Sequence, residues 1–124
     1  MNHYTIELQS RTKSLAISII KIVQSIKIDL ANRNIISQIL RSSSSIGANY
    51  NEALESESKD DFVHKLSICK KEARETLYWL DLLLTTKPNQ LKQIEVLIQE
   101  TTELVRIFAA TIATTKRNKL NKMV

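Results

Sequence analysis

Apolar residues recur at alternating spacings of three and four along four segments of this 124-residue chain. The third segment forms one such seam, made of Phe62, Leu66, Cys69, Ala73, Thr76, Leu80 and Leu83. This spacing places the side chains on one face of an α-helix, as the seam of a helix bundle requires. The chain contains one Gly and one Pro, which leaves little material for the tight turns of a sandwich or barrel. The sequence therefore predicts an all-α fold.

The other three segments repeat this pattern. Their apolar positions are Leu8, Leu15, Ile19, Ile22 and Ile26; then Ile36, Ile39, Ser43, Ile46, Tyr50 and Ala53; then Leu91, Ile94, Ile98, Thr101, Val105, Phe108 and Ile112. We expect helices over residues 7–29, 33–57, 59–86 and 88–116, in a single domain over 1–124 that ends in a basic tail over 116–124. Short connections make successive helices antiparallel, which predicts an up-down-up-down four-helix bundle.

Local signals at the helix ends support these boundaries. A run of serines inside the second segment opposes its assignment as a helix. Ser58 precedes Asp61 by three residues, the spacing of a capping box. Pro88 ends the third helix, because the residue before a proline avoids the helical region. Residues 42–45 are four serines followed by Ile46 and Gly47, which propensity alone assigns to a loop. The apolar period continues through them, so we expect a helix whose small side chains let a neighbouring backbone approach.

The positive charge gathers at the C-terminal end. The chain has 18 Lys and Arg against 13 Asp and Glu, a net charge of +5. Four of these cations lie in the last nine residues, where there is no acid, so the rest of the chain carries +1. A basic end favours contact with the phosphates of nucleic acid, although a short basic tail also serves solubility alone. The candidate nucleic-acid-binding residues are Lys116, Arg117, Lys119 and Lys122.

Residues suited to catalysis or metal binding are sparse. A di-metal bundle site uses Glu-x-x-His pairs on two helices, and the nearest spacing here is Asp61-x-x-His64, present once. Cys69 lies on the apolar seam, where we expect a buried, unreactive thiol. We therefore expect a non-enzyme without metal or cofactor. An enzyme that uses buried glutamates stays an alternative, with Glu52, Glu72 and Glu75 as its candidates.

The rest of the composition bounds the setting of the protein. One cysteine excludes an intramolecular disulfide. No apolar run reaches the ~18 residues of a spanning helix, and the first residues lack the pattern of a signal peptide. We expect a cytoplasmic protein with no membrane partner.

Trp79 lies one step off the third seam, next to Leu80, and Tyr78 precedes it. Such aromatics either flank the core or anchor a second subunit. The first segment also carries Ile20 beside its seam, which makes its apolar stripe wide. A bundle with more apolar surface than one core needs hides the surplus in an oligomer, so we take Tyr78 and Trp79 as candidate interface residues.

Two blocks of sequence resemble a known family. The first comprises Arg41, Ser45, Ile46, Ala48, Asn49 and Glu52, and the second comprises Phe62, Ala73, Glu75, Tyr78, Trp79 and Leu80. Both are similar to the four-helix-bundle family encoded by intervening sequences in 23S ribosomal RNA genes. The resemblance implies an antiparallel bundle that assembles into a ring-like homopentamer, with no known catalytic residue or cofactor. A related bundle, the accessory variability determinant of diversity-generating retroelements, works with a reverse transcriptase and binds nucleic acid.

The polar residues of these blocks suggest a network. Asn49 and Glu52 are three residues apart and share a helix face, while Arg41 lies just over two turns back from Asn49. Glu75 on the third helix is placed to meet Arg41 or Asn49. We expect a polar network that fixes helix register or partner choice, and a ligand-binding pocket stays the alternative. The members of the predicted polar network are Arg41, Ser45, Asn49, Glu52 and Glu75.

The function that we expect is a non-catalytic, homo-oligomeric bundle, which serves as a binding or scaffold module for RNA, DNA or a nucleic-acid enzyme such as a reverse transcriptase. The alternative is a protein-binding adaptor with no nucleic-acid role.

Overall fold

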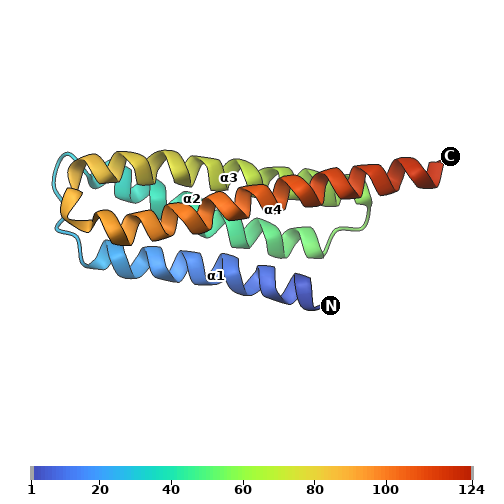
Figure 1. Cartoon of the computed structure of the whole chain (residues 1–124), viewed down its shortest axis with the longest axis horizontal. Helices are drawn as coiled ribbons and strands as arrows, with labels where there is room; N and C mark the ends of the chain where they lie inside the picture. The colour runs from blue at the N-terminus through green and yellow to red at the C-terminus, as the bar shows by residue number, and fades with distance from the viewer. Residues whose placement is uncertain (1, 124) are drawn as a thin grey trace.

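The computed structural model describes residues 2–123, with side chains over residues 2–121, and this part of the chain is built from helices alone (Figure 1). Its elements are α1 (His3–Gln24), α2 (Arg33–Leu54), α3 (Lys59–Thr86), the 3-10 turn η1 (Pro88–Gln90) and α4 (Leu91–Met123). The predicted all-α fold with four long helices is confirmed. In these described residues, no helix has the length and apolar character to cross a membrane.

The helices lie side by side, with α2 and α3 in contact along their length (Figure 1). Their contacts run in opposite order along the two helices. Thr76 Oγ1 lies 2.8 Å from Ser42 Oγ, and Lys65 Nζ lies 3.2 Å from Glu52 Oε2. Moving ten residues forward along α2 therefore moves eleven residues back along α3.

The core lies between the four helices and is mostly aliphatic. Its fully buried side chains include Ile19 on α1, Ile46 on α2, Leu80 on α3 and Phe108 on α4. The Phe108 and Tyr50 rings meet with centroids 6.1 Å apart. One continuous cluster therefore joins all four helices.

The predicted seam of the last helix is wrong at three positions. Leu91 is exposed, and Ile98 and Val105 are only partly buried, whereas Leu97 and Leu104 lie in the core. The cause is that α4 packs against both α3 and α1. Its core-facing line runs between these two neighbours, so a single row of side chains does not describe it.

The loop between α1 and α2 starts earlier than the predicted boundary at residue 29. The last helical residue of α1 is Gln24. Asn32 explains the difference, because its fully buried side chain binds the loop backbone. Its Oδ1 accepts from the Asp29 N–H at 2.9 Å, and its Nδ2 donates to the Lys27 carbonyl at 3.1 Å. Buried polar groups need such partners, and here they fix a loop where helix was expected. At its other end α1 begins at His3, capped by the Asn2 side chain, rather than at residue 7.

Two further boundaries differ from the prediction. The last residue of α2 is Leu54 rather than residue 57, because the Glu55 and Ser56 N–H groups bond back three residues and close a tight last turn. The first residue of α4 is Leu91, and the helix continues through the predicted tail to Met123. Residues 116–123 contain no Gly or Pro, and cations at a helix C-terminus interact favourably with its dipole.

The serine run is helical, as the apolar period predicts. Ser42 and Ser43 are buried. A Cβ at Gly47 would lie 3.2 Å from Thr12 Oγ1. Gly47 thus lets α1 approach α2 closely, which confirms the packing role expected for small side chains.

Candidate functional site

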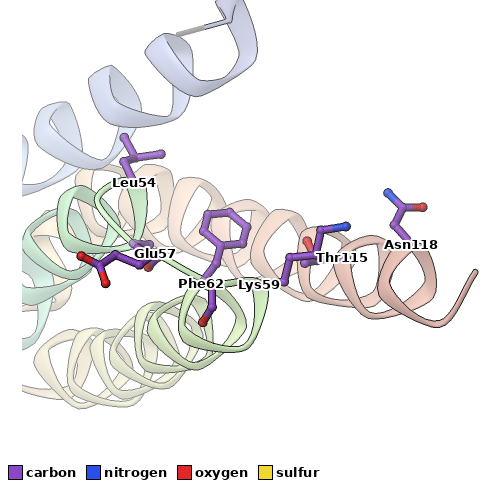
Figure 2. Close-up of a pocket in the computed structure, with 9 residues that line it drawn as sticks. Leu54, Glu57, Lys59, Phe62, Thr115 and Asn118 are labelled. Atoms are coloured by element: carbon purple, nitrogen blue, oxygen red, sulfur yellow. The ribbon is translucent and has the colours of Figure 1, made fainter. Parts of the chain in front are cut away.

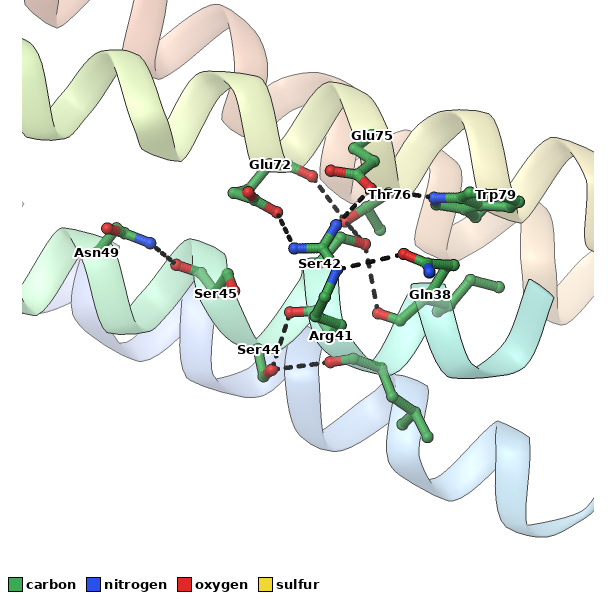
Figure 3. A network of polar contacts seen from close by, with 12 residues as sticks. Gln38, Arg41, Ser42, Ser44, Ser45, Asn49, Glu72, Glu75, Thr76 and Trp79 are labelled. Atoms are coloured by element: carbon green, nitrogen blue, oxygen red, sulfur yellow. Dashed lines mark hydrogen bonds and ion pairs between the residues drawn. The ribbon is translucent and has the colours of Figure 1, made fainter. Parts of the chain in front are cut away.

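The side chain of Arg41 on α2 reaches two carboxylates of α3 (Figure 3). Its Nη1 donates to Glu72 Oε2 at 3.2 Å, and its Nη2 donates to Glu75 Oε1. Its Nε donates to Gln38 Oε1 at 3.2 Å. Glu72 and Glu75 are three residues apart on one helix face, so a single planar guanidinium reaches both. We call Arg41, Glu72 and Glu75 the arginine cluster.

The arginine cluster is partly open to solvent. The side chains of Arg41, Glu72 and Glu75 are 47%, 12% and 30% exposed. The hydrogen bond from Arg41 lowers the pKa of Glu75, and the same bond raises the pKa of Arg41. Both groups are therefore held in their charged forms. The arrangement suits a fixed ion pair between helices and provides no group poised to exchange a proton near neutral pH.

Trp79 is tied to this cluster, because its Nε1 donates to Glu75 Oε1 at 3.3 Å. It is half-buried and packs against the core. Tyr78 lies edge-on to it, with ring centroids 5.1 Å apart and an interplanar angle of 78°. Tyr78 is 59% exposed. Trp79 thus belongs mainly to the flank of its own bundle, and Tyr78 is the ring that is offered to solvent.

The other residues of the predicted network bond elsewhere. Asn49 Nδ2 donates to the Ser45 carbonyl at 2.8 Å within α2 (Figure 3). Glu52 pairs with Lys65. Eight residues of helix advance ~80° beyond two full turns, which turns Asn49 away from the face of Arg41. Of the five predicted members, the structure joins Arg41 to Glu75 and Asn49 to Ser45 as two separate pairs, and Glu52 belongs to neither.

The predicted basic residues lie on the last turns of α4. Lys116 and Arg117 are exposed, and neither forms an ion pair within the part of the chain that the structure describes. Lys119 Nζ contacts Asp60 Oδ1 at the start of α3. The side chain of Lys122 lies outside the described residues. One of these cations is thus already paired with an acid of its own chain.

A second contact between one arginine and two glutamates was not predicted from the sequence. Arg11 on α1 contacts Glu100, and its Nη2 lies 3.1 Å from Glu103 Oε1 on α4. The hydrogen bond to Glu100 raises the pKa of Arg11. The available signal was the spacing of Glu100 and Glu103, which repeats the three-residue spacing of Glu72 and Glu75.

The one cysteine, Cys69, is buried in the core. Burial of Cys69 raises its pKa to about 12, so its thiol stays protonated. The described residues contain no group of three or more His, Cys, Asp or Glu side chains placed to hold a metal.

A groove of about 480 Å³ opens at the end of the bundle, between the α2–α3 connection and α4 (Figure 2). Phe62 and Leu54 form its apolar side, and Thr115 and Asn118 line it from α4. Its acidic residue is Glu57.

Comparison with known proteins places the chain in a family. Residues 5–110 match the family described as 23S rRNA-intervening sequence protein. The chain belongs to this family. No match was found among curated proteins.

A protein of known structure shares the fold of this 23S rRNA-intervening sequence protein. It is a protein with unknown function from the S23 ribosomal protein family of Bacteroides thetaiotaomicron VPI-5482. The two chains are 35% identical, with a TM-score of 0.73, over 85% of this chain and 97% of the other. The arginine cluster lies inside the matched region, whereas the basic end of α4 lies beyond residue 110. The basic end is therefore a feature of this chain that the family match does not cover.

Proposed function

We propose that this chain is the protomer of a non-catalytic ring of antiparallel up-down-up-down bundles that binds nucleic acid. The observation that carries the proposal is the charge of α4, because no acid follows Glu103. Five cations do follow it, namely Arg106, Lys116, Arg117, Lys119 and Lys122. Cations without acidic partners attract phosphates and gain free energy from the release of counterions.

The apolar surface of α1 supports the oligomeric part of the proposal. Ile6, Ile17 and Ile20 are 54%, 41% and 44% exposed. Ile17 and Ile20 are three residues apart, and Ile6 lies about three turns before Ile17, so all three lie toward one side of α1. A second copy would remove them from water, with the exposed ring of Tyr78 as the contact offered by its α3. In a ring of five, four C-terminal cations per chain would place about twenty together, which raises the avidity for a polyanion.

Fluorescence anisotropy with a labelled hairpin RNA over a salt series tests the nucleic-acid part. The variants are a chain ending at Thr115 and the double substitution Lys116→Gln with Arg117→Gln. The matched control is Lys21→Gln with Lys92→Gln, which removes the same charge from exposed positions near the opposite end. We expect weaker binding and a smaller salt slope for both tail variants and a smaller effect for the control. No binding by the full chain at low salt would overturn the proposal.

Sedimentation velocity tests the oligomeric part. Ile17→Glu places a charge on the apolar side of α1, and we expect it to yield monomers with unchanged helical circular dichroism. Asn89→Glu adds the same charge in η1 and should leave the oligomer intact. A monomeric wild-type chain, or an oligomer indifferent to Ile17→Glu, would contradict the ring.

The alternative function is a protein-binding adaptor, and one surface favours it. A groove of about 650 Å³ runs between α1 and α2, lined in part by Ala16, Ser44, Gly47 and Ala48. Such small side chains let a partner helix approach closely. A pull-down whose partners survive nuclease treatment, together with no RNA binding by the pure protein, would favour the adaptor.

A further inference from the structure

Several cations on the body of the bundle form no ion pair within the described residues, and three of them lie on the two helices that form the α3–α4 edge. These three are Lys70 and Arg74 on α3 and Arg106 on α4. Arg74 and Arg106 are exposed and Lys70 is half-buried. None forms an ion pair within the described residues. Lys70 and Arg74 are also four residues apart on one helix, where like charges repel and cost stability.

The contact between Lys119 and Asp60 sets the register of α3 against α4. Arg74 lies fourteen residues after Asp60, and Arg106 lies thirteen residues before Lys119. At ~1.5 Å per residue, both arginines lie about 20 Å from this contact. Because α3 and α4 pack side by side (Figure 1), Arg74 and Arg106 lie at the same level of the bundle.

Around Glu72 the two flanks of α3 differ in charge, although Lys65 faces Glu52 of α2 further along the helix and Asp81 follows Arg74 by seven residues on the same face. Glu72 faces α2, where it meets Arg41. Lys70 and Arg74 are each two residues from Glu72, a rotation of ~200°. Their side chains therefore leave α3 on the flank away from α2, which is the flank toward α4 and Arg106.

The stretch of α4 between Arg106 and the C-terminal cations has no charged residue and carries short side chains on its outer face. From Arg106 to Lys116 is ~15 Å along α4. The outward residues between them include Ala110 and Ala113, which are exposed. Short side chains leave room for a bulky polymer to approach the helix. We call Lys70, Arg74, Arg106, Lys116 and Arg117 the cationic strip.

We propose that the cationic strip holds the phosphate backbone of a nucleic acid along the α3–α4 edge, and that the C-terminal cations are one end of this surface. The proposal rests on the nucleic-acid binding proposed above. A tail acting alone has less charge to offer, because Lys119 is paired with Asp60. The strip adds three cations on α3 and α4 that form no ion pair within the described residues.

Anisotropy on the full chain separates the strip from the tail. The body variant is Lys70→Gln with Arg74→Gln, the tail variant is Lys116→Gln with Arg117→Gln, and the control is Lys21→Gln with Lys92→Gln. All three lower the charge by the same amount. The probes are a hairpin RNA and a DNA hairpin of the same sequence, which distinguish the two sources of phosphate. Each lost phosphate contact lowers the salt slope by roughly 0.7 to 0.9.

We expect the body variant to lower the salt slope by about 1.5 and to weaken binding about tenfold or more at 0.1 M salt, as the tail variant does. The control should change the affinity by less than about threefold, since distant charges are screened. Binding that falls with the tail variant but not with the body variant would overturn the strip and leave the tail proposal standing. Equal loss with the control would also overturn the strip, because net charge alone would then explain it. No binding by the wild-type chain would remove the nucleic-acid function itself.

Discussion

Replacing Arg41 by methionine should destabilise the fold moderately and in a pH-dependent way. Methionine keeps an apolar stem but removes the guanidinium that joins Glu72 and Glu75. A partly exposed ion pair contributes about 0.2 to 1 kcal/mol, and Arg41 is 47% exposed, so each pair counts toward the lower half of that range. The two carboxylates also repel once the cation is gone, by about 0.2 to 0.5 kcal/mol. We expect a loss of about 1 to 1.5 kcal/mol near neutral pH.

The pH dependence follows from Glu75. Arg41 lowers its pKa in the folded chain below the ordinary value of 4.5. A carboxylate with a lowered folded pKa contributes stability that is fully present above its unfolded pKa and is lost as the pH falls through the folded pKa. The penalty of Arg41→Met should therefore shrink in acid, where Glu75 takes up a proton in both states.

Urea unfolding followed by circular dichroism, near neutral pH and in acid, measures this penalty. Glu75→Gln and the double variant complete a cycle, and the coupling between the two sites should be about 0.2 to 0.6 kcal/mol. Two results would refute the reasoning. One is a penalty that is the same at both pH values, and the other is a coupling energy of zero. Either would mean that the effect of Arg41→Met does not arise from the ion pair with Glu75.

Three further substitutions and one chemical reaction probe the packing. Phe108 is fully buried, so Phe108→Ala should cost about 3 to 5 kcal/mol in urea unfolding, and a loss below 1 kcal/mol would contradict its core position. Gly47→Val should destabilise the fold by about 1 to 3 kcal/mol, because a Cβ at position 47 would lie 3.2 Å from Thr12 Oγ1. Gly47→Ala should be nearly neutral, since a gain in helix propensity of about 1 kcal/mol offsets the contact; equal losses for both would argue against this. The Cys69 thiol, with a pKa of about 12, should react with iodoacetamide only after unfolding, and rapid reaction of the native chain would show an open site.

The sequence predicted the helices because the apolar period persists even where local propensity opposes it, as in the serine run. It did not predict where α1 ends, because that depends on the buried side chain of Asn32 and its bonds to the loop backbone. It placed Ile98 and Val105 in the seam because a single period cannot describe a helix with two neighbours.

The candidate site was predicted in part. The Arg41 and Glu75 side chains meet between α2 and α3. The spacing of residues along these two helices predicted both members of this pair. Glu72, which completes the arginine cluster, was considered only as a candidate for catalysis. Asn49 lies apart from Arg41 because eight residues of helix advance ~80° beyond two full turns, whereas Glu52 keeps the face but lies ~16 Å further along α2. The Lys119 contact with Asp60 required the register of α3 against α4, which no local pattern contains.

The salt dependence of RNA binding by the intact chain is the most direct test of the central claim, that α4 and its edge with α3 form a phosphate-binding surface. Five cations of the strip, at roughly 0.7 to 0.9 each, predict a slope of log affinity against log salt of about −3.5 to −4.5 per bound protomer. A slope in this range, reduced by both the body and the tail variants, would support the claim. A slope near zero, or no binding at low salt, would contradict it.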